Sequence, residues 1–356
     1  MHRTLARIAA AFASAAVLTL AAATAAPADP AVTPPANSVV GFNTPQSKGL
    51  FDQLAADYNA YLAGRGDTTS PRVYLWDSYV SGPLIVVPKV GGPAITRPND
   101  EQLQKALEYN WHDTVDFVVA THGRDATAFT DHDFIQLGRS AVTWAAPTTG
   151  ANAPANLTTA DLIGIYTCTK QTWDQITDIP NYTGPYRVPI HAYLPQVGAE
   201  TRDQFLLALG SSGVPLTPGG CVQAATPAPD EGTDPVFQDP NAVVPYNASH
   251  YVAQVYNDHG TAADAPGLLS LRNTDGYLPV SAALHQVNPG FAATRYGMQV
   301  DVVVRHSDWT SGPFNLPAVF GPGTTGGWTC VNATARADLI SWGVVPVAST
   351  LCGKPA

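Results

Sequence analysis

Segments with strand-like and helix-like patterns of apolar residues alternate along most of this chain. VDFVVAT at 115–121 is a short continuous apolar run, whereas LFDQLAADYNAYL at 50–62 repeats its apolar residues every three or four positions. Such alternation is typical of an α/β fold with largely parallel sheets, and no internal repeat interrupts it. The other predicted strands are 38–42, 72–78, 187–194, 242–246 and 298–306, and the other predicted helices are 101–111, 158–167, 248–258 and 335–343.

The first 28 residues have the pattern of a secretory signal peptide. Arg3 and Arg7 form a basic start, residues 8–26 are apolar and rich in Ala, and small residues suit cleavage near residue 25 or 28. A single membrane anchor is the alternative interpretation. No Cys lies near the cleavage point, so a lipoprotein anchor is not supported, and no later apolar run is long enough to span a bilayer. We therefore expect a secreted or periplasmic protein that starts with a flexible Pro- and Ala-rich leader at 29–37.

The charge of the chain excludes several classes of partner. Two of the 18 Lys and Arg residues and none of the 28 Asp and Glu residues lie in the signal peptide, so the net charge of residues 29–356 is −12. A chain this acidic, without a basic run, argues against binding to nucleic acid or to an anionic membrane surface.

The four cysteines predict disulfide bonds. An even number of Cys in an exported chain favours disulfides, and the sequence alone allows three pairings of Cys168, Cys221, Cys330 and Cys352. A zinc site is the alternative, but no C-x-x-C or neighbouring His pair supports one.

The stretch YLPQVGAETRDQFLLALG, residues 193–210, contains a turn followed by a helix. Thr201 is the expected N-cap, with Gln204 completing a capping box, and Gly210 is the expected end. A helix start offers free N–H groups and partial positive charge, which suits an oxyanion. Glu200, however, places a carboxylate at this helix start.

Three stretches resemble the phosphate-type solute-binding proteins of ABC transporters, which have the type 2 periplasmic-binding-protein fold. Residues 141–176 resemble the family's crossing strand with its helix and Trp-Asp turn, 193–210 its second-domain anion loop and helix, and 241–254 the strand that returns to the first domain. Residues 95–107 and 115–121 resemble first-domain segments more loosely. The resemblance covers roughly residues 38–260, and the last hundred residues cannot be aligned.

This resemblance implies two α/β lobes joined by two crossing hinge strands, with a ligand held between the lobes. Lobe I would comprise residues 38–142 plus 246–356, and lobe II residues 143–245. Ligand binding would close the cleft by a hinge motion. We favour the disulfides Cys168–Cys221 and Cys330–Cys352, because each then stays within one lobe.

The sequence departs from the family at its anion-binding positions. Where the family has Gly-Ser-Gly-Thr, this chain has Gly198, Ala199, Glu200 and Thr201, so a hydroxyl is lost and a carboxylate gained. A second Gly-Ser-Gly of relatives is replaced by Asp-Glu-Gln at 100–102. A unit charge near a dianion in a partly desolvated cleft costs several kcal/mol. The motif is therefore degenerate, and a neutral or cationic solute competes with phosphate as the expected ligand.

Several candidate ligand-binding residues have a structural alternative. Trp144 either stacks on the ligand or packs at the lobe junction, and Asn43 and Thr44 either bind ligand or form a turn that caps the next helix. Strand-end residues such as Asp77 and His122 are either ligand groups or ordinary loop residues. The complete predicted set is Asn43, Thr44, Asp77, Ser78, Thr121, His122, Trp144, Gly198, Glu200, Thr201 and Arg202.

The sequence gives no support for catalysis, a metal or a cofactor. In the DHD stretch at 131–133, three consecutive side chains cannot converge on one metal ion, and the HSD stretch at 306–308 lacks the separated segments of a triad. No G-x-S-x-G, H-E-x-x-H or P-loop motif occurs.

Three functions follow in order of preference. The first is a monomeric, non-enzymatic solute-binding protein for a small solute or oxyanion, with an ABC permease as a candidate partner. The second is an extracellular interaction or structural protein that kept the fold without a working cleft, and the third is a secreted hydrolase.

Overall fold

The structure is a computed structural model that describes residues 29–78, 84–98, 103, 107, 114–120, 130–179, 181–225, 230–262, 264–323 and 326–355. The predicted signal peptide and most of the helix predicted at 101–111 lie outside these residues.

One sheet runs through both halves of the molecule. Its strands are β1 (Val39–Asn43), β2 (Val73–Asp77), β5 (Phe117–Ala120), β6 (His132–Pro147), β8 (His191–Leu194), β9 (Gln223–Ala224), β10 (Ala242–Asn247), β11 (Leu269–Leu271), β15 (Gly297–Arg305) and β16 (Val345–Pro346). Their order is β2-β1-β5-β15-β6-β10-β8-β9, and β11 and β16 also pair with β6. Two-stranded pairs are β3 (Ile85–Val86) with β4 (Ile95–Thr96), β7 (Asn156–Leu157) with β12 (Asn273–Thr274), and β13 (Val280–Ser281) with β14 (Gln286–Val287).

The two ends of this sheet are parallel and its middle is antiparallel. At one end β1 pairs in parallel with β2 and β5, and at the other end β8 pairs in parallel with β10 and β9. Between them β15 is antiparallel to β5 and β6, and β6 is antiparallel to β10. Each parallel end belongs to a different lobe.

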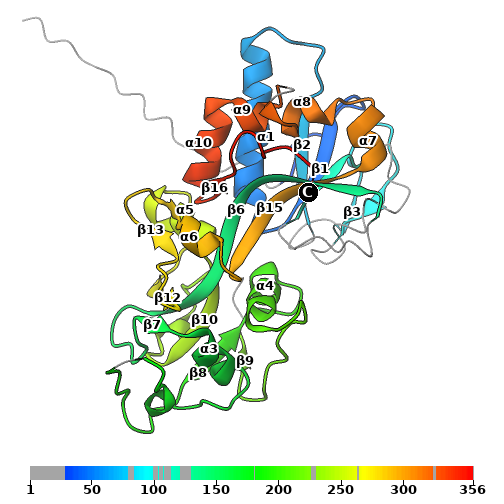
Figure 1. The fold of residues 1–356 in the computed structure, drawn as a ribbon. Coiled ribbons are helices and arrows are strands. Elements are labelled where there is room, and N and C mark those ends of the chain that lie inside the picture. Colours follow the sequence, from blue (N-terminus) through cyan, green and yellow to red (C-terminus); the bar gives the residue numbers. More distant parts are fainter. Residues whose placement is uncertain are drawn as a thin grey trace, which may run out of the picture.

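Strands β6 and β10 connect the lobes. The 16-residue β6 runs from the upper into the lower lobe of Figure 1, and its later part pairs with β10 through Ala145–Val244 and Thr143–Tyr246. The two-lobed α/β fold with two crossing strands is therefore confirmed.

The predicted helices that fall on described residues are present. They are α1 (Lys48–Gly64), α3 (Thr159–Tyr166), α4 (Glu200–Leu209), α5 (Ala248–Tyr256) and α10 (Ala333–Ser341). Short helices not predicted are η2 (Trp173–Gln175), η3 (Pro235–Gln238), α6 (Pro289–Ala292), α7 (His306–Ser311), α8 (Leu316–Phe320) and α9 (Trp328–Val331).

The start of α4 differs from its prediction. The N-cap is Ala199, which has no hydroxyl to offer, and Glu200 is already the first helical residue. Thr201 therefore lies inside the helix and the predicted capping box is wrong, whereas Gly210 ends the helix as expected. In contrast, Thr158 caps α3 through a full capping box with Asp161.

Separate hydrophobic cores support the two lobes. In lobe I, Val302 packs with Phe51 of α1 on one face of the sheet, and Val303 packs with Phe42 on the other. This alternation is the two-residue period of a strand that is buried on both faces. In lobe II, Tyr166 and Phe205 pack edge to face, with ring centroids 5.1 Å apart.

Both predicted disulfides are confirmed. Cys168–Cys221 joins the end of α3 to the chain before β9, and Cys330–Cys352 joins α9 to the C-terminal segment. The structure records no free cysteine in the described part of the chain.

Two segments refine the predicted organisation. The leader contacts lobe I at two points, through Asp29 bound to Arg97 and through the Pro34 carbonyl, which accepts a hydrogen bond from the Val90 amide. Residues 269–274 pair with the lobe II portion of β6 and with β7. We propose to keep the predicted lobe limits with one amendment, the assignment of 269–274 to lobe II.

Candidate functional site

The start of α1 in lobe I and the start of α4 in lobe II meet at the lobe junction. The Thr44 hydroxyl donates a hydrogen bond to Glu200 Oε2 at 3.2 Å, although the two residues are 156 positions apart. Thr44 is 1% exposed and Glu200 is fully buried. The structure therefore joins the two lobes through one pair of predicted ligand-binding residues.

The turn between β1 and α1 holds Thr44 in place. The Thr44 amide donates to Ser47 Oγ at 3.0 Å, and the Ser47 amide donates to Thr44 Oγ1 at 3.2 Å. The Thr44 carbonyl accepts from the Lys48 amide at 2.9 Å. Thr44 thus belongs to the turn that precedes α1, whose N-cap is Ser47, and its hydroxyl also reaches the opposite lobe.

The turn before α4 holds Glu200. Gly198 has φ +83°, a left-handed conformation that glycine adopts without strain, and Ala199 is 2% exposed. Glu200 is in the first turn of α4, where the helix dipole favours a negative charge. Its carboxylate lies toward lobe I, where Oε2 accepts the Thr44 hydroxyl.

Thr201 and Arg202 are bound within lobe II. The Thr201 hydroxyl donates to Asp230 Oδ2 at 2.7 Å, and Asp230 Oδ1 accepts the amide of Asn247, the last residue of β10, at 2.5 Å. Burial raises the pKa of the Asp230 carboxyl. Arg202 Nη1 donates to the Pro195 carbonyl at 2.9 Å. Through Asp230, the start of α4 is connected to a crossing strand.

A second polar cluster lies at the carboxyl ends of β1 and β2. Lys48 forms an ion pair with Asp77, and Asn43 Nδ2 donates to Asp52 Oδ1 at 3.2 Å. Arg97 binds the Asp29 carboxylate through two bonds of 2.8 and 2.7 Å. Burial raises the pKa of Asp52 to about 7, against the opposing effect of Lys48.

The remaining predicted residues have different outcomes. The Ser78 amide donates to the Asn43 carbonyl at 2.9 Å, and Ser78 is fully buried. Trp144 is fully buried in the lobe II core, and its indole N–H donates to the Asn273 carbonyl at 3.0 Å, which places it in the packing role. Thr121 and His122 lie outside the described residues.

Sequence reasoning missed Asp230 and Asn247 as partners of the predicted site. Asn247 follows a strand and precedes a helix, and its side chain accepts the amides of Ser249 and His250 as a regular N-cap. The sequence therefore allowed Asn247 to be predicted as a helix cap. Asp230 follows a Pro-rich loop, and no sequence pattern connects it with Thr201.

The described part of the chain gives no candidate metal site or membrane span. No group of three or more His, Cys, Asp or Glu side chains that could bind a metal occurs among these residues. In the DHD stretch, Asp133 pairs instead with His306 at 2.9 Å. No helix among the described residues is long and apolar enough to cross a bilayer.

Comparison with known proteins gives structural relatives only. No protein-family model matches the chain, and no curated protein matches it. An ABC-type phosphate transport receptor from Vibrio cholerae superposes with a TM-score of 0.56 and 11% identity, covering 86% of this chain and 99% of the receptor. A putative phosphate ABC transporter substrate-binding protein from Clostridium perfringens, solved with bound phosphate, superposes with a TM-score of 0.52 and 12% identity. The match covers 87% of this chain and 99% of that protein. The chain therefore has the fold of the phosphate-type substrate-binding proteins of ABC transporters.

Proposed function

We propose that this chain is an exported solute-binding protein that holds a small solute between its two lobes, beside Thr44 and Glu200. The observation that carries this proposal is the hydrogen bond between these residues, which joins the starts of α1 and α4 from opposite lobes. The fold shared with two phosphate receptors supports it. No covalent chemistry is involved, and the candidate partner of the loaded protein is an ABC permease.

The carboxylate of Glu200 sets the ligand chemistry. It is fully buried at the start of α4, so an anion bound there would lie beside another negative charge. Two unit charges about 4 Å apart interact by about 4 kcal/mol at the effective dielectric constant of partly buried sites. Such a repulsion weakens binding by about three orders of magnitude. We therefore assign the junction to a neutral or cationic solute rather than to phosphate.

Thermal unfolding of residues 29–356 with a panel of solutes tests this assignment. The panel contains phosphate, sulfate, sugars, amino acids and polyamines, each at millimolar concentration. A solute at about 100 times its Kd adds about 2.7 kcal/mol to the free energy of unfolding. We expect a rise in melting temperature with a neutral or cationic solute and none with phosphate or sulfate.

Replacing Glu200 by Gln locates that solute. Glu200→Gln keeps the shape and the acceptor for Thr44 but removes the charge, so the affinity for a cationic solute should fall at least about tenfold. Asp203→Asn, also in the first turn of α4, is the matched control and should leave the affinity within about twofold of wild type. Equal affinities of wild type and Glu200→Gln for a cationic solute would place its binding elsewhere.

The burial of the junction favours a second function. Thr44 already donates a hydrogen bond to Glu200 between the lobes, and both residues are buried, as in a protein that kept the fold for an extracellular interaction or structural role. The solute panel separates the two functions, because this second protein would show no shift in melting temperature with any solute.

Two further properties have their own tests. Sedimentation of residues 29–356 tests the proposed monomer, and mass analysis of the secreted chain tests cleavage near residue 25 or 28.

A further inference from the structure

A cavity of about 590 Å³ opens in lobe I, away from the lobe junction. Asp116 at its floor directly precedes β5, and its carboxylate accepts the amide of Val40 at the beginning of β1. Thr44, in contrast, follows the end of the five-residue β1. The cavity therefore lies near the amino ends of β1 and β5. It is separated from the junction by roughly the length of a strand, which rises about 3.3 Å per residue. Its volume is in the range of small-molecule sites.

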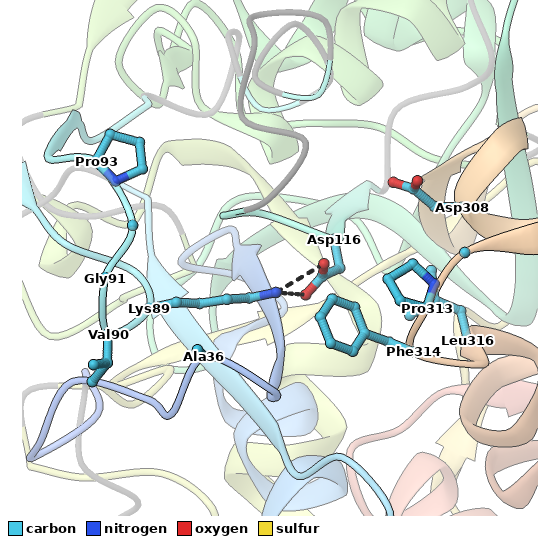
Figure 2. A pocket seen from close by; sticks show the side chains of 12 residues that line it. Ala36, Lys89, Val90, Gly91, Pro93, Asp116, Asp308, Pro313, Phe314 and Leu316 are labelled. Carbon is cyan, nitrogen blue, oxygen red and sulfur yellow. Dashed lines mark hydrogen bonds and ion pairs between the residues drawn. The ribbon is translucent and has the colours of Figure 1, made fainter.

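A buried ion pair forms part of the cavity lining. Lys89 Nζ lies 3.0 Å from Asp116 Oδ1 and 2.7 Å from Oδ2, and the two side chains are only 1% and 4% exposed. The same ammonium lies 4.2 Å from the centroid of the Phe314 ring, as Figure 2 shows beside the pair. The charge of Lys89 is thus matched by Asp116 and covered by an aromatic ring, so it offers little attraction to a further anion.

Apolar side chains approach the cavity from two sides. Pro93 and Val90 approach from one side and Pro313 and Phe314 from the other (Figure 2). Val90, which lines the cavity, is 55% exposed. Exposed apolar side chains beside a cavity favour a ligand with an apolar body.

Asp308 is the second carboxylate of the lining. Its side chain is 21% exposed, and Oδ2 accepts a bond from Arg305 Nη1 at 2.7 Å. Arg305 itself is buried, and its other described bonds go to the carbonyls of Leu107 and Val115. Burial raises the pKa of Asp116, and the negative charge of Asp308 contributes to that rise against the effect of Lys89. Among the charged side chains of the described lining, Asp308 is the most exposed, whereas Lys89 and Asp116 are only 1% and 4% exposed, so a ligand in the cavity contacts the Asp308 carboxylate first.

We propose that this cavity is a second ligand site, which binds an amine with an aromatic or aliphatic body, the apolar part against Phe314 and Pro93 and the ammonium group toward Asp308. The site is independent of the lobe junction. It needs no covalent step, and its ligand differs from an oxyanion in both charge and polarity.

Three probes of similar size test the charge preference. Calorimetric titration of residues 29–356 with 2-phenylethylamine, 2-phenylethanol and 3-phenylpropionate compares a cationic, a neutral and an anionic group on one phenyl body. We expect the amine to bind roughly tenfold more tightly than the alcohol, and the acid to bind most weakly. No saturable binding of the amine, or equal binding of amine and acid, would overturn the proposal.

Two variants place the amine in this cavity. Asp308→Asn should remove the preference for the amine over the alcohol. Val90→Lys adds a positive charge at an exposed position of the cavity lining. It should therefore lower the affinity for the amine roughly tenfold without affecting folding. Asp131→Asn, at an exposed side chain that does not line the cavity, is the control and should leave the amine affinity unchanged. If both cavity variants bind the amine as wild type does, the proposed site is wrong.

Discussion

Residues 29–356 should unfold at a distinctly higher temperature at pH 5.5 than at pH 8. The main cause is Asp301 of β15, which is fully buried. Neither of its carboxylate oxygens has a hydrogen-bond partner in the described part of the structure. Burial alone raises the pKa of this carboxyl from 3.8 to about 7.

The direction follows from proton binding. Between pH 4 and pH 7 the folded protein holds a proton on Asp301 that the unfolded chain has lost, so the free energy of unfolding falls as pH rises through this window. With the pKa raised to about 7, Asp301 alone lowers that free energy by about 2 kcal/mol between pH 5.5 and pH 8. Asp52 and Asp338, whose pKa values burial also raises to about 7, act in the same direction. The lowered pKa values of Asp29 and Asp264 change stability only at more acidic pH.

Replacing Asp301 by Asn isolates this effect. Asp301→Asn has nearly the shape of the protonated acid and cannot ionise, so at pH 8 it should raise the free energy of unfolding by about 2–4 kcal/mol. It should also flatten the pH dependence. Asp131→Asn, at a side chain that is 79% exposed, is the control and should change little. A wild-type melting temperature that is highest at pH 8 would contradict the account.

Removing the lobe II disulfide should produce the second large loss of stability. Cys168 and Cys221 are 53 positions apart, and a cross-link of that span lowers the entropy of the unfolded chain by the equivalent of about 4 kcal/mol. Cys330 and Cys352 are 22 positions apart, for which the same relation gives about 3 kcal/mol.

Denaturant unfolding of paired serine variants measures both losses. We expect Cys168→Ser with Cys221→Ser to lower the free energy of unfolding by about 4 kcal/mol, and the Cys330 and Cys352 pair to lower it by slightly less. The single variant Cys168→Ser should lose about as much as its pair, since the bond is already absent. A loss below about 1 kcal/mol for the longer loop would show that the bond does not restrict the unfolded chain as expected.

Much of the fold was predictable because its elements have strong periodic patterns. The apolar spacing of 50–62 and 248–258 predicts helices that the structure contains as α1 and α5. Elements of two to five residues, such as β16 and α9, have too few positions for a period to be recognised. The start of α4 was misplaced because Thr201 is a good cap by composition, whereas Asp230 accepts its hydroxyl in the folded chain.

The candidate site was predictable in part, because part of it is local. Thr44 directly follows β1 in the turn before α1, and Glu200 begins α4 after β8, and the resemblance marks both positions in the sequence. That Glu200 reaches across to Thr44 depends on the approach of two lobes, and no local pattern encodes it. The cavity at Lys89 was not predicted, because its lining comes from segments near residues 36, 90, 116 and 312.

The position of Glu200 at the lobe junction is the centre of this account, and calorimetric titration with inorganic phosphate tests it most directly. Wild type should give no saturable heat with millimolar phosphate, and Glu200→Gln should bind phosphate more tightly than wild type because the like charge is gone. Saturable binding of phosphate by wild type that Glu200→Gln does not strengthen would contradict the account, and would show that the carboxylate lies away from the bound anion.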